Sequence, residues 1–302
     1  MPTSIKVVAS KQDIPNDPHE YYDCLVTRNF HFVTPEAQKN LKNLKVLVAG
    51  CGTAGGACIE PLARLGIMNF RLADNGEYEL SNYNRQNANI EGLGVNKATF
   101  HKRELLGINP YCDVVDYPEG ITPENCAELV KWADVIMDGV DVTASPAIQM
   151  KLLLHEWAKR EKKPTLSSLD LGFRQWGTTF DYRNDWVEPL NGKIEACRKA
   201  KHPIKALFTM FPLDAVPDHA LQLVYDVMEN ADRPASQLGA ASDLLAGVMS
   251  AAMVRFASSG ELIPGWSVDL SYLAHSKPER LKTFLKARAL RRKTKKLINE
   301  AP

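Results

Sequence analysis

The chain has 302 residues, of which 45% are hydrophobic and 24% are charged, and its formal net charge is +1. This length is enough for one large domain with an appendage and a substantial core. The near-zero net charge provides no overall field that would attract nucleic acid or a membrane surface, so neither partner is expected.

Neither the cysteines nor the apolar runs indicate a zinc site, a disulfide framework or a membrane segment. The longest uncharged apolar run, residues 244–254, is too short to span a bilayer, and the amino terminus lacks an apolar secretory core. We therefore expect a soluble, cytoplasmic protein with reduced thiols. No zinc is expected, because no C-x-x-C pair occurs among the six cysteines, which are Cys24, Cys51, Cys58, Cys112, Cys126 and Cys197.

Strands and helices alternate along the first half of the chain, after an expected amino-terminal arm at residues 1–21. Short apolar runs predict strands at 45–50, 68–74, 112–118, 134–139 and 164–170. Apolar residues at helical spacing predict helices at 34–44, 55–66, 97–110, 122–133 and 145–161. Gly66 is expected to be a helix C-cap and Thr122 a helix N-cap. This alternation predicts an α/β fold with a doubly wound, Rossmann-like, mostly parallel sheet.

The second half of the chain loses this rhythm. Residues 173–183 suggest antiparallel strands, and residues 184–235 have the mixed, proline-bearing character of a long crossing segment. A helix of small residues is predicted at 235–260 and a late strand at 265–273. The tail at 274–302 is basic and helical. It either packs on the domain as an amphipathic helix or docks an acidic partner, tRNA or an anionic surface.

A glycine-rich loop follows the first predicted strand, in the stretch NLKVLVAGCGTAGG (residues 43–56). Gly50, Gly52 and Gly55 fit G-x-G-x-x-G between a strand and a helix, where the helix amino terminus offers N–H groups to phosphates. Asp74 ends the second strand 22 residues past Gly52, where an acidic side chain can take ribose hydroxyls. These residues predict a nucleotide site of unspecified kind.

Polar and charged residues follow this loop in an order that favours ATP chemistry. Asn82, Arg85 and Gln86 lie in SNYNRQ (81–86), Lys97 heads a helix, and Asp141 follows a strand. Attack on the α-phosphate of ATP needs cations around the triphosphate and a carboxylate that holds Mg²⁺, whereas hydride transfer does not. Each residue alone could be a surface residue or a helix cap. Together they are predicted to converge at the carboxyl ends of the strands.

The sequence resembles the E1-like adenylating superfamily, which includes the bacterial molybdopterin- and thiamine-pathway activators and the ubiquitin-activating enzymes. The similarity covers about residues 22–273, and SNYNRQ is the most specific match. Further matches are the glycine-rich stretch, LARLGIMNFRLAD (62–74), GVNKA (94–98), INP (108–110) and DGVD (138–141). The resemblance implies an adenylation domain at 22–273 that adenylates a carboxylate substrate with ATP and Mg²⁺.

The resemblance also implies roles for individual residues. Gly50, Gly52 and Gly55 lie along the nucleotide, and Asp74 takes the ribose. Asn82, Arg85 and Lys97 hold the triphosphate, with Gln86 beside them at the nucleotide, and Asp141 binds Mg²⁺. Arg28, in LVTRNF (25–30), stands near the place of an arginine that reaches into the site of a partner subunit, so a homodimer is expected.

Three features depart from the pattern of that superfamily. Val142 follows Asp141 where asparagine is usual, and Gly76 stands where another acidic residue is common. The paired cysteines of a frequent zinc clamp are also missing. Cys197, among lysines and arginine in KIEACRKAKHP (193–203), is either a thioester nucleophile or a small packing residue, and we favour packing.

The predicted function is ATP- and Mg²⁺-dependent adenylation of a carboxylate with release of pyrophosphate. The expected substrate is the carboxyl terminus of a small ubiquitin-like or sulfur-carrier protein, or of a peptide. Three alternatives are an adenylator of a non-protein carboxylate, including the tRNA-modifying kind, a non-catalytic partner subunit, and an NAD-dependent dehydrogenase. A scaffold would have no need of Arg85, Lys97 and Asp141, which argues against the second of these.

Overall fold

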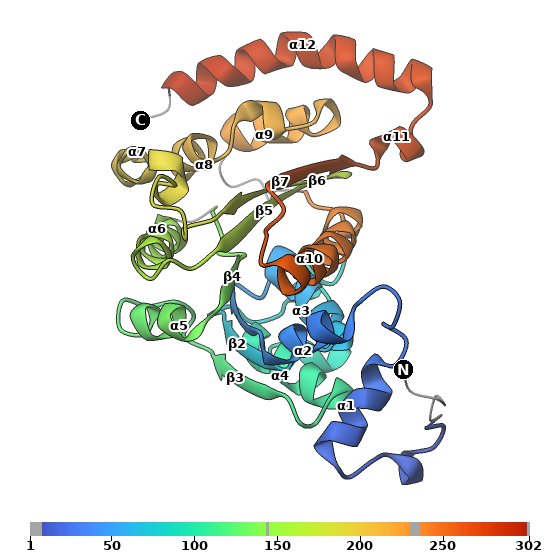
Figure 1. Ribbon diagram of the computed structural model, residues 1–302. Helices are drawn as coiled ribbons and strands as arrows, with labels where there is room; N and C mark the ends of the chain where they lie inside the picture. The colour runs from blue at the N-terminus through green and yellow to red at the C-terminus, as the bar shows by residue number, and fades with distance from the viewer. Residues whose placement is uncertain (1–7, 143–144, 230–235, 301–302) are drawn as a thin grey trace.

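The computed structural model describes residues 8–142, 145–229 and 236–300 and contains a seven-stranded sheet (Figure 1). The strand order is β3-β2-β1-β4-β5-β6-β7. Strands β1 to β5 are parallel, whereas β6 and β7 pair antiparallel, which confirms the predicted Rossmann-like sheet with antiparallel carboxyl-terminal strands. The strands are β1 (Lys45–Ala49), β2 (Asn69–Ala73), β3 (Asp113–Tyr117), β4 (Val135–Asp138), β5 (Thr165–Leu171), β6 (Arg174–Phe180) and β7 (Gly265–Asp269).

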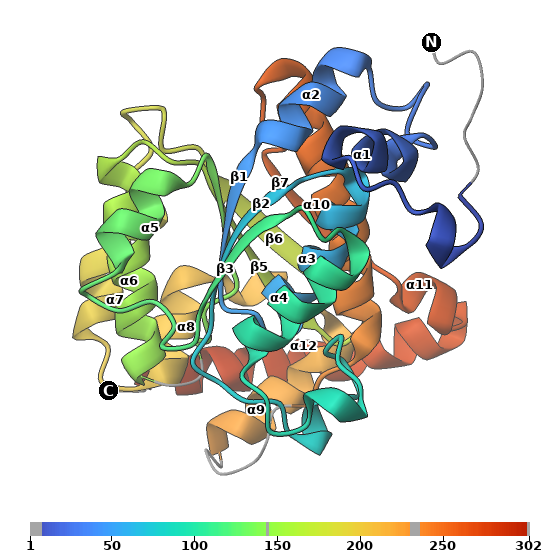
Figure 2. The ribbon, with the colours of Figure 1, turned by 90° about the horizontal axis from the view of Figure 1, so that it is seen from below.

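Helices cover both faces of the sheet (Figure 2). Strand β1 shows why, since Val46 and Val48 point into one core cluster while Leu47 and Ala49 point into the other. One face packs against α2 (Pro35–Asn43), α3 (Thr53–Leu65), α4 (Lys97–Ile108) and α10 (Gly239–Ser259). The other face packs against α5 (Cys126–Trp132), α6 (Ser145–Arg160), α7 (Ile194–Lys199) and α8 (Pro203–Met210).

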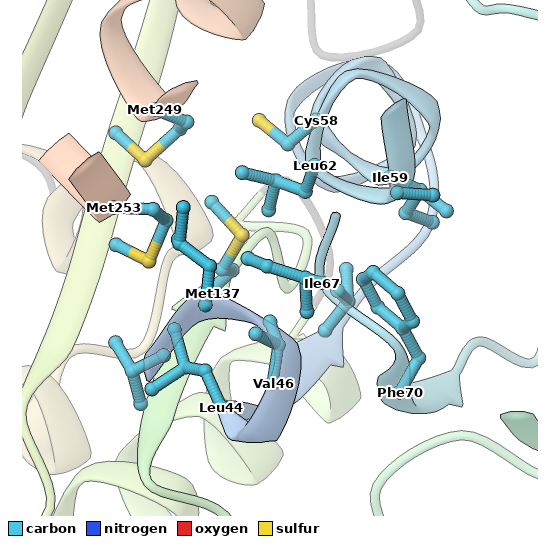
Figure 3. Close-up of a cluster of buried hydrophobic side chains, with 14 of the residues drawn as sticks. Leu44, Val46, Cys58, Ile59, Leu62, Ile67, Phe70, Met137, Met249 and Met253 are labelled. Carbon is cyan, nitrogen blue, oxygen red and sulfur yellow. The ribbon is translucent and has the colours of Figure 1, made fainter. Parts of the chain in front are cut away.

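The core of the first face lies between α3, α10 and the central strands (Figure 3). Met249 and Met253 of α10 approach Met137 of β4 and Cys58 and Leu62 of α3. By length and composition alone α10 could cross a membrane, yet it packs on α2 and α3 and contributes to this core. The small residues of α10 therefore serve close helix packing within the domain.

One helix prediction and one strand prediction need correction. The helix predicted at 122–133 begins only at Cys126, because Thr122 and Asn125 bond each other's backbone and form a turn ahead of it. Thr122 is therefore a turn residue and not the N-cap. The late strand predicted at 265–273 ends at Asp269, and α11 (Ser271–Ala274) follows, because Asp269 accepts the Ser271 N–H and starts a helical turn.

The crossing segment expected at 184–235 is ordered by packing over its described part. Besides α7 and α8 it contains α9 (Leu221–Glu229) and short 3-10 turns. Leu190, Ile194, Cys197 and Met210 are buried in the core of the second face. The prolines that made the segment look irregular stand at the starts of short helices, where proline is favoured.

The amino-terminal and carboxyl-terminal helices lie at the periphery (Figure 1). Helix α1 (Pro18–Val26) follows the arm and packs on α3. Helix α12 (Lys277–Glu300) is basic and lies across α9 and α8, with Ala287 and Thr294 buried against the domain. Arg291 anchors it by donating to the Leu213 and Val216 carbonyls. The amphipathic-packing interpretation of the tail is therefore confirmed for the middle of α12.

Candidate functional site

Close backbone packing explains two of the three glycines in the loop after β1. A Cβ on Gly55 would stand 1.9 Å from the Gly50 carbonyl oxygen, and one on Gly50 would stand 2.3 Å from the Gly139 oxygen. Gly50 also has a φ of +86°, which disfavours a side chain. A Cβ on Gly52 would meet nothing closer than the Gln86 amide at 3.7 Å. Gly52 is therefore the loop glycine whose surroundings leave room for a Cβ atom.

The amino terminus of α3 is the open end of this loop. Helices α1, α2 and α4 are each capped by a side chain, from Asp17, Thr34 and Asn96, which accepts backbone N–H groups of the first turn. At α3 the N-cap is Gly52, which has no side chain for this role. The first N–H groups of a helix have no partner within the helix and favour anions. The arrangement suits a phosphate group.

Asp74 holds the shape of the loop. Its Oδ2 accepts the Cys51 N–H at 2.6 Å, and its Oδ1 accepts the Gly76 N–H at 2.7 Å. Burial raises the pKa of the Asp74 carboxyl, while these two bonds act in the opposite direction. Because each carboxylate oxygen has a second lone pair, Asp74 keeps acceptor capacity beyond the loop. A positioning role thus accompanies the ribose-binding role predicted for this residue.

Lys97 and Asp141 lie around Asp74. Asn96 ties the start of α4 to Asp74 by donating to the Asp74 carbonyl at 2.8 Å, and Lys97 N donates to the Gly76 carbonyl. The Lys97 charge lowers the pKa of Asp74 and the Asp141 charge raises it, so both groups are its electrostatic neighbours. Three predicted site residues from separate parts of the sequence therefore converge at the glycine loop.

The SNYNRQ segment packs over the other side of the loop. Gln86 Nε2 donates to the Thr53 hydroxyl at the start of α3, while the buried Gln86 Oε1 has no protein partner. The Arg85 guanidinium donates to the Ser81 carbonyl and the Asn84 side chain, and its buried Nε lacks a protein partner. Burial lowers the pKa of Arg85. These orphaned polar atoms indicate unused bonding capacity beside the loop.

Asn82 and the carboxyl-terminal part of the chain position this segment. Asn82 Oδ1 accepts the Glu79 N–H and closes a one-turn capping box, so its carbonyl oxygen fixes the loop. The Ser242 hydroxyl of α10 donates to the Arg85 carbonyl at 3.0 Å. Helix α10 therefore supports the candidate site as well as the core.

Arg28 is the predicted site residue that the structure does not bring to this site. It is exposed in the turn after α1. Its neighbour Asn29 donates to the Leu65 carbonyl at the carboxyl end of α3, whereas the glycine loop is at the amino end. A helix of 13 residues is about 20 Å long. Arg28 thus lies about one length of α3 away from the glycine loop of its own chain.

A buried histidine beneath the loop escaped the sequence analysis. His101 of α4 is fully buried, and its Nε2 lies 2.8 Å from the Tyr78 hydroxyl. Burial lowers the pKa of His101 to about 4, so its ring is neutral at pH 7. The backbone of Cys51, in the glycine loop, lies near this ring at Gly56. The only sequence signal was a histidine on the buried face of α4.

A second buried network lies under the turn that carries Asp141. Asp138, at the end of β4, forms an ion pair with Lys151 and accepts from His155 Nε2 at 3.0 Å. Its Oδ1 accepts the Val140 N–H at 3.2 Å. His155 Nδ1 in turn lies 2.6 Å from the Tyr182 hydroxyl. Because all four side chains are almost fully buried, this network fixes the turn from inside the domain.

Asp170 is a further titratable group missed at the sequence level. It lies near the carboxyl end of β5, and Gln175 Nε2 donates a hydrogen bond to its side chain. Burial raises the pKa of Asp170 to about 6, and its charge is felt by Cys58 of α3. Asp170 is therefore a half-buried carboxyl on β5 whose charge acts on the helix that begins at the glycine loop.

Cys51 of the glycine loop and Cys197 of α7 are both buried. Cys51 is 0% exposed and Cys197 is 1% exposed. Burial raises the pKa of the Cys197 thiol to about 11, and its Sγ faces the Ala206 carbonyl. A thiol in this environment is poorly nucleophilic at pH 7, which favours the packing interpretation.

No ready-made metal site occurs among residues 8–142, 145–229 and 236–300. This part of the chain contains no group of three or more His, Cys, Asp or Glu side chains that could hold a metal ion by themselves. A carboxylate such as Asp141 fits Mg²⁺ held together with substrate phosphates, because Mg²⁺ often uses one or two carboxylates and keeps several waters. The donor set thus suits a substrate-bridged Mg²⁺ ion.

Comparison with known sequences gives consistent results. The sequence model of the ThiF family matches residues 26–285. The sulfur carrier protein ThiS adenylyltransferase of Bacillus subtilis (strain 168) is 31% identical over 151 residues, which are 49% of this chain and 43% of that protein. A probable molybdopterin-synthase adenylyltransferase of Porphyra purpurea is 32% identical over 116 residues, or 37% and 30% of the two chains. The chain thus matches less than half the length of these relatives.

Solved structures share the fold. PaaA superposes with a TM-score of 0.57 and 20% identity, covering 89% of this chain and 84% of that chain. Escherichia coli MccB in complex with AMPCPP and MccA superposes with a TM-score of 0.53 and 22% identity, covering 85% and 74%. At these identities the two structures support the architecture alone.

Proposed function

The chain belongs to the ThiF family, and from that premise we propose that it is an ATP- and Mg²⁺-dependent adenylyltransferase that activates a carboxylate and releases pyrophosphate. The observation that carries this proposal is the uncapped start of α3, where Gln86 bonds Thr53, together with Asp74 of the same loop, whose electrostatic neighbours are Lys97 and Asp141. Arg85 is next to Gln86 in the chain. An anion-binding helix end with cations and a carboxylate around it fits a nucleotide triphosphate and its metal.

The proposed chemistry is a displacement at the α-phosphorus of ATP. A carboxylate oxygen of the substrate forms a bond to this phosphorus, and the bond to the bridging oxygen of the β-phosphate breaks. Pyrophosphate leaves with the electron pair, and no proton has to move, so no strong general base is needed. Lys97 and Arg85 would stabilise the charge that develops on the phosphates. A Mg²⁺ ion held by Asp141 would supply further charge neutralisation.

The orphaned polar atoms give Gln86 and Arg85 a second task in this proposal. The Arg85 guanidinium is now bonded to its own loop, at Ser81 and Asn84. Its Nε and the Gln86 Oε1 remain available to a ligand on the loop. Nucleotide binding would satisfy buried groups that otherwise weaken the folded state by about 1–3 kcal/mol each. The site residues predicted from the sequence would thereby act together.

The proposed substrate is the carboxyl terminus of a small ubiquitin-like or sulfur-carrier protein, or of a peptide. Support comes from the Bacillus subtilis relative, whose name states that it adenylylates a sulfur carrier protein. A flexible carboxyl terminus can enter an open crevice at the sheet edge, as a bulky folded surface cannot. The proposed location is the cytoplasm, where the six cysteines would remain reduced.

We also propose that the active unit is a homodimer. Arg28 lies about one length of α3 away from the glycine loop of its own chain, so its predicted role requires a second copy. Exposed apolar side chains occur near both candidate contact regions, with Phe30 and Phe32 beside Arg28 and Leu80 and Ile90 beside SNYNRQ. Burying such side chains against a partner would stabilise a dimer.

Pyrophosphate exchange tests the proposal. Lys97→Ala and Arg85→Ala should each lower ATP–pyrophosphate exchange, measured with a panel of peptides and carrier proteins ending in Gly-Gly, by about 100-fold or more. Both residues are partly exposed, so the variants should stay folded. Matched controls are Lys131→Ala on α5 and Arg64→Ala on α3, which remove the same charges from exposed positions.

The controls should exchange at the wild-type rate. Wild-type exchange in both Lys97→Ala and Arg85→Ala would refute adenylation at this site. Calorimetric titration with ATP and with NAD supplies a second measurement that needs no acyl substrate. Tight binding of NAD without binding of ATP would replace the proposal with a dehydrogenase.

A further inference from the structure

An open cavity of about 440 Å³ lies between the last two strands and the start of α12. Arg174 at the start of β6 and Asp269 at the end of β7 form its floor. Tyr272 of α11 and the first two turns of α12, with Lys277 and Arg280, form its wall. These wall residues lie within the ThiF family match, which ends at residue 285, and most of α12 lies beyond it.

The charges of the cavity do not cancel. Arg174 is paired with Asp269 at 3.1 Å, and Asp218 is paired with Arg291 of α12 at 3.0 Å. Those ion pairs leave the cations Lys277 and Arg280 as the remaining charge of the lining. Burial lowers the pKa of His219, which keeps that ring neutral at pH 7. The lining therefore favours an anionic group.

Arg280 has bonding capacity that the protein does not use. Its guanidinium stacks 4.6 Å from the centroid of the Tyr272 ring. Its Nε is buried without a hydrogen-bond partner. Glu279, the adjacent acidic residue, bonds the Ser276 N–H and hydroxyl at the start of α12 and so faces its own helix end. A guanidinium over an aromatic ring keeps its N–H donors, which can bind a carboxylate.

Apolar side chains surround this charged cavity and are uncovered. Tyr272 is 67% exposed, Leu281 59% and Phe284 47%. Leu273 and Leu285, their neighbours in sequence, are also exposed. Later in α12 the apolar face is covered, since Ala287 is buried against the domain. A contiguous apolar rim of this kind around a charged centre is typical of a peptide-binding surface.

The cavity shares an edge with the nucleotide site. Strand β7 ends level with β5, because both run antiparallel to β6, and β5 runs four residues past Ser167, the partner of the last residue of β4. Strands β4 and β7 are three positions apart in the sheet. With a strand spacing of about 4.8 Å and a rise of about 3.3 Å per residue, the ends of β4 and β7 are separated by roughly 19 Å, which an extended peptide crosses in about six residues.

We propose that the cavity under α12 binds an acidic residue of the substrate, together with an apolar neighbour, about six residues upstream of the carboxylate that is adenylated. The proposal rests on the proposed function for the position of that carboxylate. Arg280 and Lys277 bind the acidic side chain, and the Tyr272, Leu281 and Phe284 rim receives the apolar one. The substrate class is therefore an acidic, apolar carboxyl-terminal peptide segment.

Fluorescence anisotropy with labelled decapeptides tests this proposal without ATP. Each peptide is alanine-based, ends in Gly-Gly with a free carboxylate, and carries one Leu-Glu pair placed between three and eight residues from the end. The Leu-Glu peptide of the best register should bind at least about 10-fold more tightly than its Leu-Gln counterpart, since a charge-assisted bond is worth about 1.5–3 kcal/mol. Arg280→Gln should abolish this preference, whereas Arg288→Gln, an exposed change on the same helix, should keep it.

Three outcomes would overturn the proposal. The first is equal affinity for the Glu and Gln peptides at every register. The second is a preference that persists in Arg280→Gln while thermal unfolding shows both variants to be folded. The third is displacement of the peptide by a short RNA hairpin whose own binding needs Arg280, which would make nucleic-acid phosphate the ligand. If the preference holds but the bound peptides support no ATP–pyrophosphate exchange, the cavity assignment stands and the proposed function fails.

Discussion

Two buried histidine–tyrosine pairs lie on opposite faces of the sheet, one under each loop of the candidate site. They differ in whether charged side chains join the pair. On one face, His101 meets Tyr78 beneath the glycine loop, and no charged group bonds the pair. On the other face, His155 meets Tyr182 beneath the turn that carries Asp141, and Asp138 and Lys151 join them. The first pair also leaves His101 Nδ1 without a protein partner, whereas the second bonds both ring nitrogens of its histidine.

This difference shows how the two loops are held. The turn after β4 is fixed by a charged network, because Asp138 bonds the Val140 N–H while it balances Lys151. The glycine loop is held from above by Asp74 and from below by a neutral ring. A buried network of charges is rigid but sensitive to the loss of one member. The two loops should therefore respond differently to substitution and to pH.

Removal of one charge from the network should have the largest effect. Lys151→Met leaves the Asp138 carboxylate buried without its counter-ion and should lower the free energy of unfolding by about 3–5 kcal/mol. Urea denaturation of the purified variant measures this change. The matched control is Lys102→Met, which breaks a partly exposed pair with Asp116 and should change stability by about 1 kcal/mol or less.

The double variant Asp138→Asn with Lys151→Met separates charge from volume. It removes both charges, so most of the lost stability should return. A double variant as unstable as the single one would mean that Lys151 acts through packing, and the contrast between the two faces would fail.

The pH dependence of stability should come next in size. His101 has a folded pKa of about 4, below the ordinary value of 6.5, so the unfolded state binds more protons between these values and stability falls as the pH falls. Asp170 has a folded pKa of about 6, above its ordinary 3.8, so its contribution falls as the pH rises through this window. Each term amounts to about 3 kcal/mol, and the two oppose each other.

Single variants should expose these opposing terms. His101→Gln removes the term that makes stability rise with pH. From pH 4 to pH 6 the free energy of unfolding of this variant should therefore rise less than that of the wild type, or fall more steeply. Asp170→Asn should do the reverse and retains an oxygen for Gln175 Nε2. Chemical denaturation at half-unit pH steps measures both slopes. Slopes unchanged from the wild type in the His101 variant would show that this ring is not held neutral by burial.

The two tyrosines provide the smallest and sharpest comparison. Tyr182 bonds His155 and also accepts the Leu190 N–H, so Tyr182→Phe leaves two buried groups without a partner and should cost about 2–3 kcal/mol. Tyr78→Phe breaks one bond to His101 and should cost about 1 kcal/mol. Thermal unfolding at pH 7 ranks the two variants. An equal or reversed ranking would show that the network around Asp138 does not extend to Leu190.

The part of the fold that was predictable is the part in which local pattern and tertiary position agree. The β1–α3–β2 unit follows from an apolar run, a glycine motif and helical spacing within 30 residues. Segment 184–229 gave no such pattern, because its helices have only six to nine residues and take their stability from packing of Leu190, Ile194 and Met210. Because of Thr122 the helix was predicted to begin four residues too early, since a turn that begins with threonine has the same sequence features as a helix cap.

The candidate site was predictable where its residues follow a motif. Lys97 and Asp141 were expected near Asp74 because Lys97 begins a helix and Asp141 follows a strand, and both places converge at the carboxyl ends of the strands. The buried network was not, because Asp138, His155 and Tyr182 are far apart in sequence and meet only in the fold. One signal was present: Lys151 and His155 are four residues apart, which places both polar side chains on the buried face of α6.

The close approach of Gly50, Gly55 and Gly139 also bears on how this loop can change over time or in the laboratory. Each of the three excludes a side chain because another of them occupies the space, so a substitution at one position gains nothing from a substitution at the next. They form a mutational unit that is inherited or lost together. Gly52 stands outside this unit, beside Gln86. It is the position in the loop through which ligand preference can drift while the fold remains intact.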